Sequence, residues 1–214
     1  ATHWWFRGRR ILLSKIIGEL GLPLGAPILD IVTSTGPNLR MLKMMGFSNV
    51  SGIDKSPRAV RFCAKKGLGK VFLGDICGLP FDDGQFRLVL ATDILEHVEN
   101  DLAALSQIRR VLAPGGIVLI TAPAFNCIWG MQDEISHHKR RYLLSPLIRK
   151  LDKTGFTRLE SFYFNYILFF PIWAARRVIR LLGIHLKSEN QINTRSINRI
   201  FSRLFAFDVW SARR

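Results

Sequence analysis

The chain has 214 residues, of which 48% are apolar, so it can form one folded domain with an appendage and is not globally disordered. Residues 1–136 hold 15 basic and 12 acidic side chains, whereas residues 137–214 hold 16 and 4, so the C-terminal third is the part expected to meet an anionic partner. A solvated basic face is the alternative. The three scattered cysteines predict no disulfide framework and no bound metal, and with no signal peptide at the start they favour a reducing cytoplasm.

Short β-type runs alternate with amphipathic stretches from residue 27 onward. Strands are expected over residues 27–32, 49–54, 71–74, 86–92, 117–122 and 156–164. Helices are expected over residues 37–45, 57–66, 101–112 and from Ser145-Pro146 to about Lys153. This alternation implies βαβ units, so we predict an α/β, Rossmann-like, doubly wound and mostly parallel sheet. No seventh strand is expected after Phe207, and the chain is expected to stop before one.

Four acidic residues, Asp30, Asp54, Asp75 and Asp93, each fall at or just after the end of an expected strand. In a doubly wound sheet, ligands bind beyond the carboxyl ends of the strands. Turns and helix caps favour acids in any protein, which accounts for one or two of the four. Four acids along one edge therefore indicate a ligand site.

At these residues the chain resembles the class I S-adenosylmethionine-dependent methyltransferases. The resemblance covers about residues 25–160. ILDIVTSTGPNL, GIDKSP, GDICGLPF and FRLVLATDILEHV resemble the first four motifs of that group, and IRRVLAPGGIVLITAP resembles the segment after them. A dehydrogenase would carry G-x-G-x-x-G after the first strand, and a nucleic-acid amino-methyltransferase an N-P-P-Y-like fourth motif. The chain has neither, which argues against a nucleic-acid partner.

The resemblance implies S-adenosylmethionine as cofactor. Asp54 would accept hydrogen bonds from the ribose hydroxyls, and Asp75 from the adenine amino group beside Ile76 and Leu79. Thr92 and Asp93 would line the place where cofactor and acceptor meet. The remaining cofactor-side residues implied are Asp30, Val32, Ser34, Gly36 and Lys55.

The first motif departs from the family pattern, because Val32 and Ser34 stand where glycines are usual. Glycine tolerates a positive φ there, and a β-branched residue does not. Either the turn is rearranged or cofactor affinity is reduced. A non-catalytic binding module that kept the fold is therefore the second hypothesis.

On the acceptor side, WGMQDEISHHKRRY at residues 129–142 and the opening HWWFRGRR resemble segments of methyltransferases that work near lipid or polysaccharide pathways. Removing a proton from an oxygen or nitrogen acceptor suits a histidine. The candidate catalytic residues are His97, His138 and Asp133, with His137 as the weaker choice. Packing beneath the cofactor is an equal alternative for His97, and a solvated loop for the other two histidines. The implied acceptor is a small or lipid-linked molecule or a saccharide.

We divide the chain into an N-terminal helical lid (residues 1–24), a cofactor-binding domain (residues 25–160) and an appendage (residues 161–214). Within the appendage, Ser161–Ala175 is free of charge, and Arg176, Arg177 and Arg180 share one helix arc. This pattern predicts an interfacial helix over 162–183 on an anionic membrane, at the inner face. Packing on the domain or on a second copy of the chain, as a homodimer, is the alternative.

Overall fold

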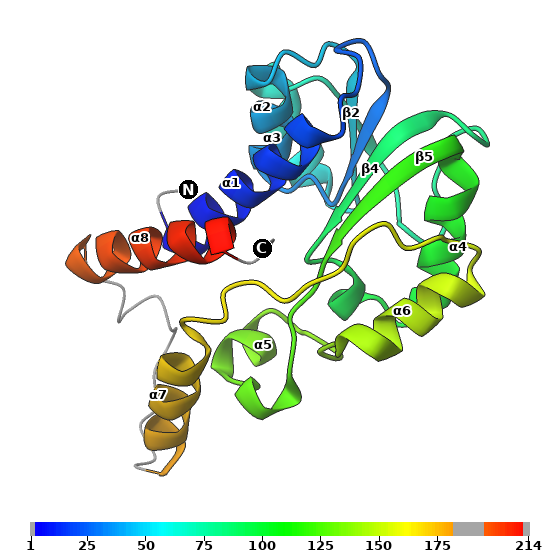
Figure 1. Cartoon of the computed structure of the whole chain (residues 1–214). Helices are drawn as coiled ribbons and strands as arrows, with labels where there is room; N and C mark the ends of the chain where they lie inside the picture. Colours follow the sequence, from blue (N-terminus) through cyan, green and yellow to red (C-terminus); the bar gives the residue numbers. More distant parts are fainter. Residues whose placement is uncertain (1–2, 182–194, 212–214) are drawn as a thin grey trace.

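The computed structural model describes residues 3–181 and 195–211 (Figure 1). Its centre is a five-stranded sheet in the order β3-β2-β1-β4-β5, and every pair of neighbours is parallel. The strands are β1 (Ile28–Ile31), β2 (Val50–Asp54), β3 (Lys70–Leu73), β4 (Phe86–Thr92) and β5 (Leu112–Thr121). The predicted α/β Rossmann-like fold is confirmed.

Helices cover both faces of this sheet. One face carries α1 (Trp4–Glu19), α2 (Pro37–Met44) and α3 (Pro57–Lys65), and the other carries α4 (Asp101–Val111) and α6 (Leu144–Lys153). Three short elements, η1 (Leu95–His97), η2 (Asn126–Ile128) and α5 (Met131–Ile135), lie in loops. The strand order reverses between β1 and β4, so the carboxyl ends of these two strands mark the place where such sheets bind ligands.

Local sequence explains where most elements begin and end. All four residues of β1 are buried, as expected for a strand covered on both faces. Gly46 and Gly67 have φ values of 94° and 60°, so they end α2 and α3 as predicted. β5 begins at Leu112 rather than at residue 117, because residues 113–116 form an irregularity inside the strand rather than a free turn.

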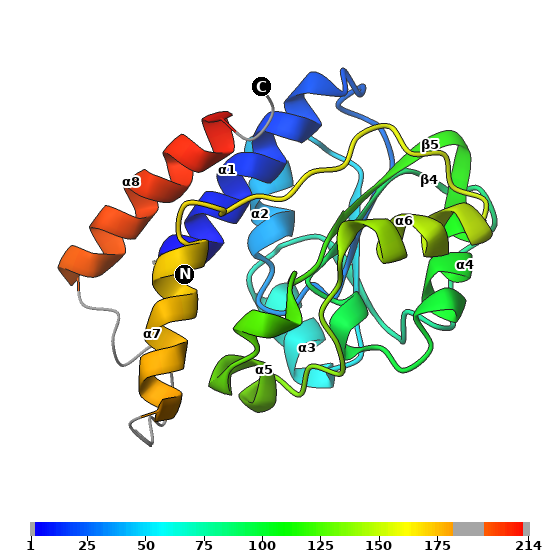
Figure 2. The ribbon, with the colours of Figure 1, turned by 60° about the horizontal axis from the view of Figure 1, so that its bottom comes forward.

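The C-terminal helices α7 (Phe169–Leu181) and α8 (Arg195–Ser211) lie apart from the sheet (Figure 2). α8 runs beside α1, and the two helices share an apolar cluster with the segment before α7. The approach is close at Gly8, where an added Cβ would stand 2.0 Å from Cδ1 of Phe205. The N-terminal helix is therefore held between the sheet and α8.

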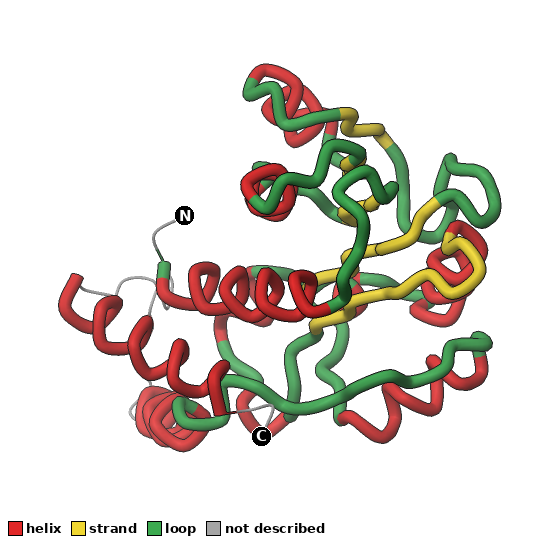
Figure 3. The backbone as a smooth tube through the Cα atoms, turned by 45° about the horizontal axis from the view of Figure 1, so that its top comes forward, coloured by secondary structure: helices red, strands yellow, loops and turns green. Residues whose placement is uncertain are grey.

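Two predictions for residues 143–168 are wrong. Residues 156–164 form no strand but belong to an irregular segment between α6 and α7 (Figure 3). The rings of Phe162 and Phe164 pack instead in the cluster of α1 and α8, and the ring of Phe164 lies parallel to that of Phe205. Helix α6 begins at Leu144 with Leu143 as its N-cap, so Ser145-Pro146 lie inside its first turn and do not cap it.

The interfacial helix predicted over residues 162–183 is also shorter than expected. α7 begins only at Phe169, because Phe162 and Phe164 contribute to the α1–α8 cluster; Leu182 and Gly183 lie outside the described residues. Among the helices that the structure describes, none is both long and apolar enough to cross a membrane.

Candidate active site at the carboxyl edge of the sheet

The turn after β1 keeps a glycine-type backbone without the usual glycines. Val32, Ser34 and Gly36 have φ values of 60°, 51° and 75°. The N–H of Val32 donates to the carbonyl oxygen of Ile53 at 2.8 Å, so the turn is tied to β2. The turn is therefore not rearranged, and its two non-glycine residues hold a strained conformation.

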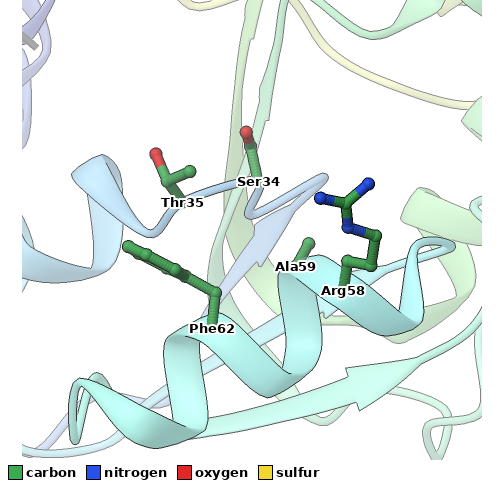
Figure 4. Close-up of a pocket in the computed structure, with 5 residues that line it drawn as sticks. All are labelled: Ser34, Thr35, Arg58, Ala59 and Phe62. Carbon is green, nitrogen blue, oxygen red and sulfur yellow. The ribbon is translucent and has the colours of Figure 1, made fainter.

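Asp54 ends β2 directly beside this turn. One carboxylate oxygen accepts the N–H of Ser34 at 2.7 Å and the other accepts the N–H of Ser56 at 2.8 Å. Each oxygen has a second lone pair, which these bonds leave available. The neighbouring Lys55 is exposed. A shallow hollow lined by Ser34, Thr35, Arg58, Ala59 and Phe62 lies between the turn and α3 (Figure 4).

A buried polar network lies beneath the turn. The side-chain amide of Asn38 donates to Asp30 at 2.9 Å and to the hydroxyl of Thr92 at 3.1 Å. Burial is the main cause that raises the pKa of Asp30 to about 7, against the opposing effect of the Asn38 hydrogen bond. Oδ2 of Asp30 and Oδ1 of Asn38 have no hydrogen-bond partner among the described residues, so each of these atoms can accept a further hydrogen bond.

Asp93 follows β4 and has a φ of 51°. Its side chain accepts a hydrogen bond from Thr121 at 2.7 Å and forms an ion pair with the buried Arg9 of α1. Sequence reasoning missed Arg9, since one of three arginines in the opening helix carries no signal of its own. The structure thus places the N-terminal helix at the site.

Asp75, the remaining acid of the four, lies at the protein surface. Asp75 is exposed and accepts the N–H of Cys77 at 2.8 Å, whereas Ile76 and Leu79 beside it are buried. Asp75 lies in the loop that follows β3, whose neighbour in the sheet is β2. An acidic rim and apolar neighbours are the features that an adenine ring with an exocyclic amine requires.

The acceptor-side residues form a second cluster. Nδ1 of His138 lies 2.8 Å from Oδ1 of Asp133, which is fully buried. The rings of His97 and His138 meet edge to face with centroids 4.7 Å apart. The backbone N–H of Lys139 donates to the carbonyl oxygen of Glu96 at 2.7 Å, which ties the loop after β5 to η1. His137, by contrast, is exposed.

Charged neighbours set the protonation states of this cluster. Burial opposes ionisation of Asp133, but hydrogen bonds from Arg141 and from the N–H of Gly130 hold its pKa below the usual value. Burial, followed by His138 and Lys55, lowers the pKa of His97. A lowered pKa keeps an imidazole neutral near pH 7, with one lone pair free to accept.

Glu96 is a residue that sequence reasoning gave no role. It is buried between the two histidines and Asp93, and burial together with Asp93 raises its pKa to about 8. Its Oε2 atom has no partner within the described part of the chain. Glu96, His97 and His138 each offer a ligand atom, and these atoms lie within 4.8 Å of one another. The sequence predicted no metal site because His138 lies 41 positions after His97.

The residues at the edge fit S-adenosylmethionine. The Asp54 carboxylate keeps unused lone pairs at the end of β2, and Asp30 presents a buried oxygen without a described partner. These are the acceptor groups that ribose hydroxyls and an ammonium group need.

Comparison with known proteins agrees with this geometry. Residues 29–120 match the family model described as "Methyltransferase domain". Demethylmenaquinone methyltransferases of Staphylococcus aureus are 27% identical over 175 residues, which span 75% of this chain and 70% of theirs. A Bacillus halodurans protein described as a candidate methyltransferase shares the fold, with a TM-score of 0.62 and 20% identity over 84% of this chain and 87% of that one.

Phosphoethanolamine N-methyltransferase 2 of Haemonchus contortus, solved with S-adenosylmethionine, also shares the fold. Its TM-score is 0.63 and its identity 20%, over 92% of this chain and 47% of that one. The fold is that of the class I S-adenosylmethionine-dependent methyltransferases, and the motifs and the family match point to the same class. The chain is thus similar to the methyltransferase-domain family over residues 29–120, and this similarity implies S-adenosylmethionine as the methyl donor.

Proposed function

We propose that the chain transfers a methyl group to an oxygen or nitrogen of a small, apolar, lipid-linked molecule by in-line displacement. The observation that carries the proposal is the buried Asp133–His138 pair, which faces His97 on the acceptor side of the cofactor edge. The Staphylococcus aureus relatives, whose name gives demethylmenaquinone as the acceptor, support a small organic acceptor rather than a macromolecule. A saccharide acceptor remains the alternative.

The cofactor half of the site would hold S-adenosylmethionine through hydrogen bonds to the polar groups of that cofactor. Asp54 would accept from the ribose, Asp75 from the adenine amine, and Asp30 from the ammonium group. Val32, Ser34 and Gly36 would present the backbone of the turn, with Ile76, Lys55, Thr92 and Asp93 around it. When bound, S-adenosylmethionine supplies a methyl group on a positively charged sulfur.

His138 would take the acceptor's proton. Its Nδ1 faces Asp133, so the tautomer with a proton on Nδ1 is favoured and Nε2 carries the lone pair that can accept a proton. Asp133 is itself held by Arg141 through two hydrogen bonds of 2.9 Å, so the ring has a fixed orientation. An activated donor needs alignment and proton removal, and this pair supplies the second requirement.

The C-terminal helices support a membrane-bound acceptor. α7 and α8 expose large apolar side chains, among them Phe170, Leu181 and Trp210, together with the exposed Arg177 and Arg203. An apolar surface with arginines suits an anionic bilayer.

α7 also contacts the acceptor side of the site. Arg176 of α7 donates to the carbonyl oxygen of Ile128, and its Nη1 lies 3.9 Å from Asp133. The ring of Phe169 lies edge to face with that of Phe125, their centroids 5.3 Å apart. A membrane-facing helix would therefore stand beside the acceptor cluster, and this is the basis for proposing a lipid-linked acceptor.

Methyl transfer from radiolabelled S-adenosylmethionine into the organic extract of bacterial membranes tests the catalytic proposal. His138→Ala is expected to lose about 10²–10⁴-fold in rate, the usual share of a general base. His137→Ala is the matched control and should keep the rate. Equal rates for both variants would remove His138 from the reaction.

Vesicle flotation tests the membrane proposal. The chain should float with phosphatidylglycerol vesicles, stay behind with phosphatidylcholine vesicles, and release as salt rises. Retention in the unbound fraction with anionic vesicles at low salt would contradict it. Self-association, measured by analytical ultracentrifugation, would then account for the exposed apolar side chains.

A non-catalytic binding module is the second candidate, and the strained turn favours it. Val32 and Ser34 carry side chains where the cofactor backbone contact is expected, which disfavours tight binding. Thermal shift with S-adenosylmethionine separates the two. A ligand at about one hundred times its Kd adds about 2.7 kcal/mol, whereas a chain that lost the cofactor shows no shift.

A further inference from the structure

We propose that Glu96, His97 and His138 bind a divalent transition-metal ion of the kind that histidine nitrogens coordinate, with Zn²⁺ as the reference ion. The three residues come from two separate segments, η1 and the loop after α5, yet their ligand atoms lie within 4.8 Å of one another. The inference rests on the proposed function only in placing the ion on the acceptor side, and its test is binding rather than turnover.

The buried carboxylate is the first argument. Glu96 is 1% exposed, and its Oε2 has no hydrogen-bond partner among the described residues. A buried polar atom without a partner is rare in folded proteins, and an ion or ordered water is the usual reason for one. The two imidazole rings beside Glu96 offer nitrogen ligands rather than hydrogen-bond donors alone, which favours an ion.

The second argument is that both histidines are already oriented as ligands. Asp133 holds Nδ1 of His138, so Nε2 is the free ligand atom. His97 is hydrogen-bonded to the backbone of Ser136. Metal-binding histidines nearly always engage their second nitrogen with a carboxylate or a backbone carbonyl, because this contact fixes the ring and its tautomer. Solvated histidines have no need of such contacts.

The surrounding charges leave room for a cation. Two carboxylates offset the buried guanidinium groups near Glu96: Arg141 pairs with Asp133, which Arg176 also approaches at 3.9 Å, and Arg9 pairs with Asp93. Lys55, the third positive group near His97, is exposed and screened by solvent. Glu96 is the remaining acid of the cluster, and a divalent ion would balance it.

The ligand set indicates which ions fit. Two imidazoles and one carboxylate suit zinc and divalent iron, manganese, cobalt or nickel, and disfavour calcium and magnesium, which prefer oxygen. Ligand atoms about 2.1 Å from one ion are at most about 4.2 Å apart, so small side-chain rotations from the present spacing close the site. Three protein ligands leave at least one position open, where an acceptor oxygen would bind.

The ion and the acceptor's proton compete for Nε2 of His138. In the loaded site His138 therefore cannot act as the base. An acceptor hydroxyl bound to the ion would become acidic and lose its proton to solvent, leaving an oxygen nucleophile on the metal. In the unloaded site, Nε2 is free to take the proton as proposed above.

Metal binding by the tag-free, metal-stripped full chain tests the proposal. Titration with Zn²⁺ by calorimetry, and with Co²⁺ by visible absorption, should show one ion per chain. Glu96→Gln, His97→Ala and His138→Ala should each weaken Zn²⁺ binding by at least about 100-fold. Asp133→Asn should weaken it by about 10–100-fold, the usual effect of losing a contact to a ligating histidine. His137→Ala is the matched control and should bind as the natural chain does.

Each variant is also checked for its fold by circular dichroism and for S-adenosylmethionine binding by thermal shift. Ligand loss with a retained fold supports the site. No stoichiometric binding by the natural chain, or unchanged affinity in folded Glu96→Gln and His138→Ala, overturns it. Zn²⁺ binding without any S-adenosylmethionine binding would overturn the proposed methyl transfer but leave the metal site standing, so the two proposals fail separately.

Discussion

Replacing Ser34 with glycine should stabilise the protein. Ser34 is exposed and has a φ of 51°, a conformation that costs an L-residue about 1–2 kcal/mol relative to glycine. Removing this cost stabilises the fold, but glycine also raises the conformational entropy of the unfolded chain, which offsets about 0.5–1 kcal/mol of the stabilisation. Asp54 bonds the backbone N–H of residue 34, so that contact survives the change. The expected net gain is about 0.5–1 kcal/mol, or about 1–4 °C in Tm for a chain of this size.

Thr35→Gly is the matched control. Thr35 is also exposed, but its φ is not in the left-handed region, so glycine there brings only the entropic cost. Urea unfolding and differential scanning calorimetry should show Ser34→Gly above the natural chain and Thr35→Gly below it by about 0.5–1 kcal/mol. If both variants lose stability equally, the turn is not strained, and the argument from its φ values fails.

The other predictions concern the buried acids and the helix contact. Asp54→Ala should weaken S-adenosylmethionine binding in calorimetry by more than about 100-fold and also lower stability, since two backbone N–H groups lose their acceptor. As the pH rises from about 4 to 7, the natural chain should lose on the order of 4 kcal/mol of folding stability, because the folded pKa of Asp30 is raised. The stability of Asp30→Asn, measured by urea unfolding, should lack that loss. Gly8→Ala should cost about 1–3 kcal/mol, relieved in part by Phe205→Leu.

The parallel sheet was predictable because its signals are local. Buried strands read as short apolar runs, and Gly46 and Gly67 stand where the helices end. The edge acids follow from the same reading, since strand ends in a parallel sheet meet at one side. The sixth strand was predicted wrongly, because Phe162 and Phe164 suit a β-strand and an aromatic cluster equally well, and only tertiary packing decides between them.

The site's long-range partners could not be read from the sequence. Glu96 reads as part of a motif, and only the fold shows that its carboxylate is buried beside His138. The contact depends on Lys139, whose N–H bonds the carbonyl oxygen of Glu96, and on Tyr142, whose hydroxyl bonds Asp101 and the carbonyl oxygen of Leu95. Pairings across 40 or more positions leave no periodic trace in a single sequence.

Helices α1 and α8 pack together, and α1 reaches the cofactor edge. α1 delivers Arg9 to Asp93, and α8 holds α1 through the contact of Phe205 on Gly8, so a C-terminal helix supports a buried ion pair at the site. Arg176 of α7 reaches the acceptor loop at Ile128 in the same way. A membrane surface that fixed the positions of α7 and α8 would therefore affect both the cofactor half and the acceptor half of the site through these side-chain contacts. On this argument, binding to an anionic bilayer would affect the cofactor side through Arg9 and the acceptor side through Arg176, without a separate regulatory domain.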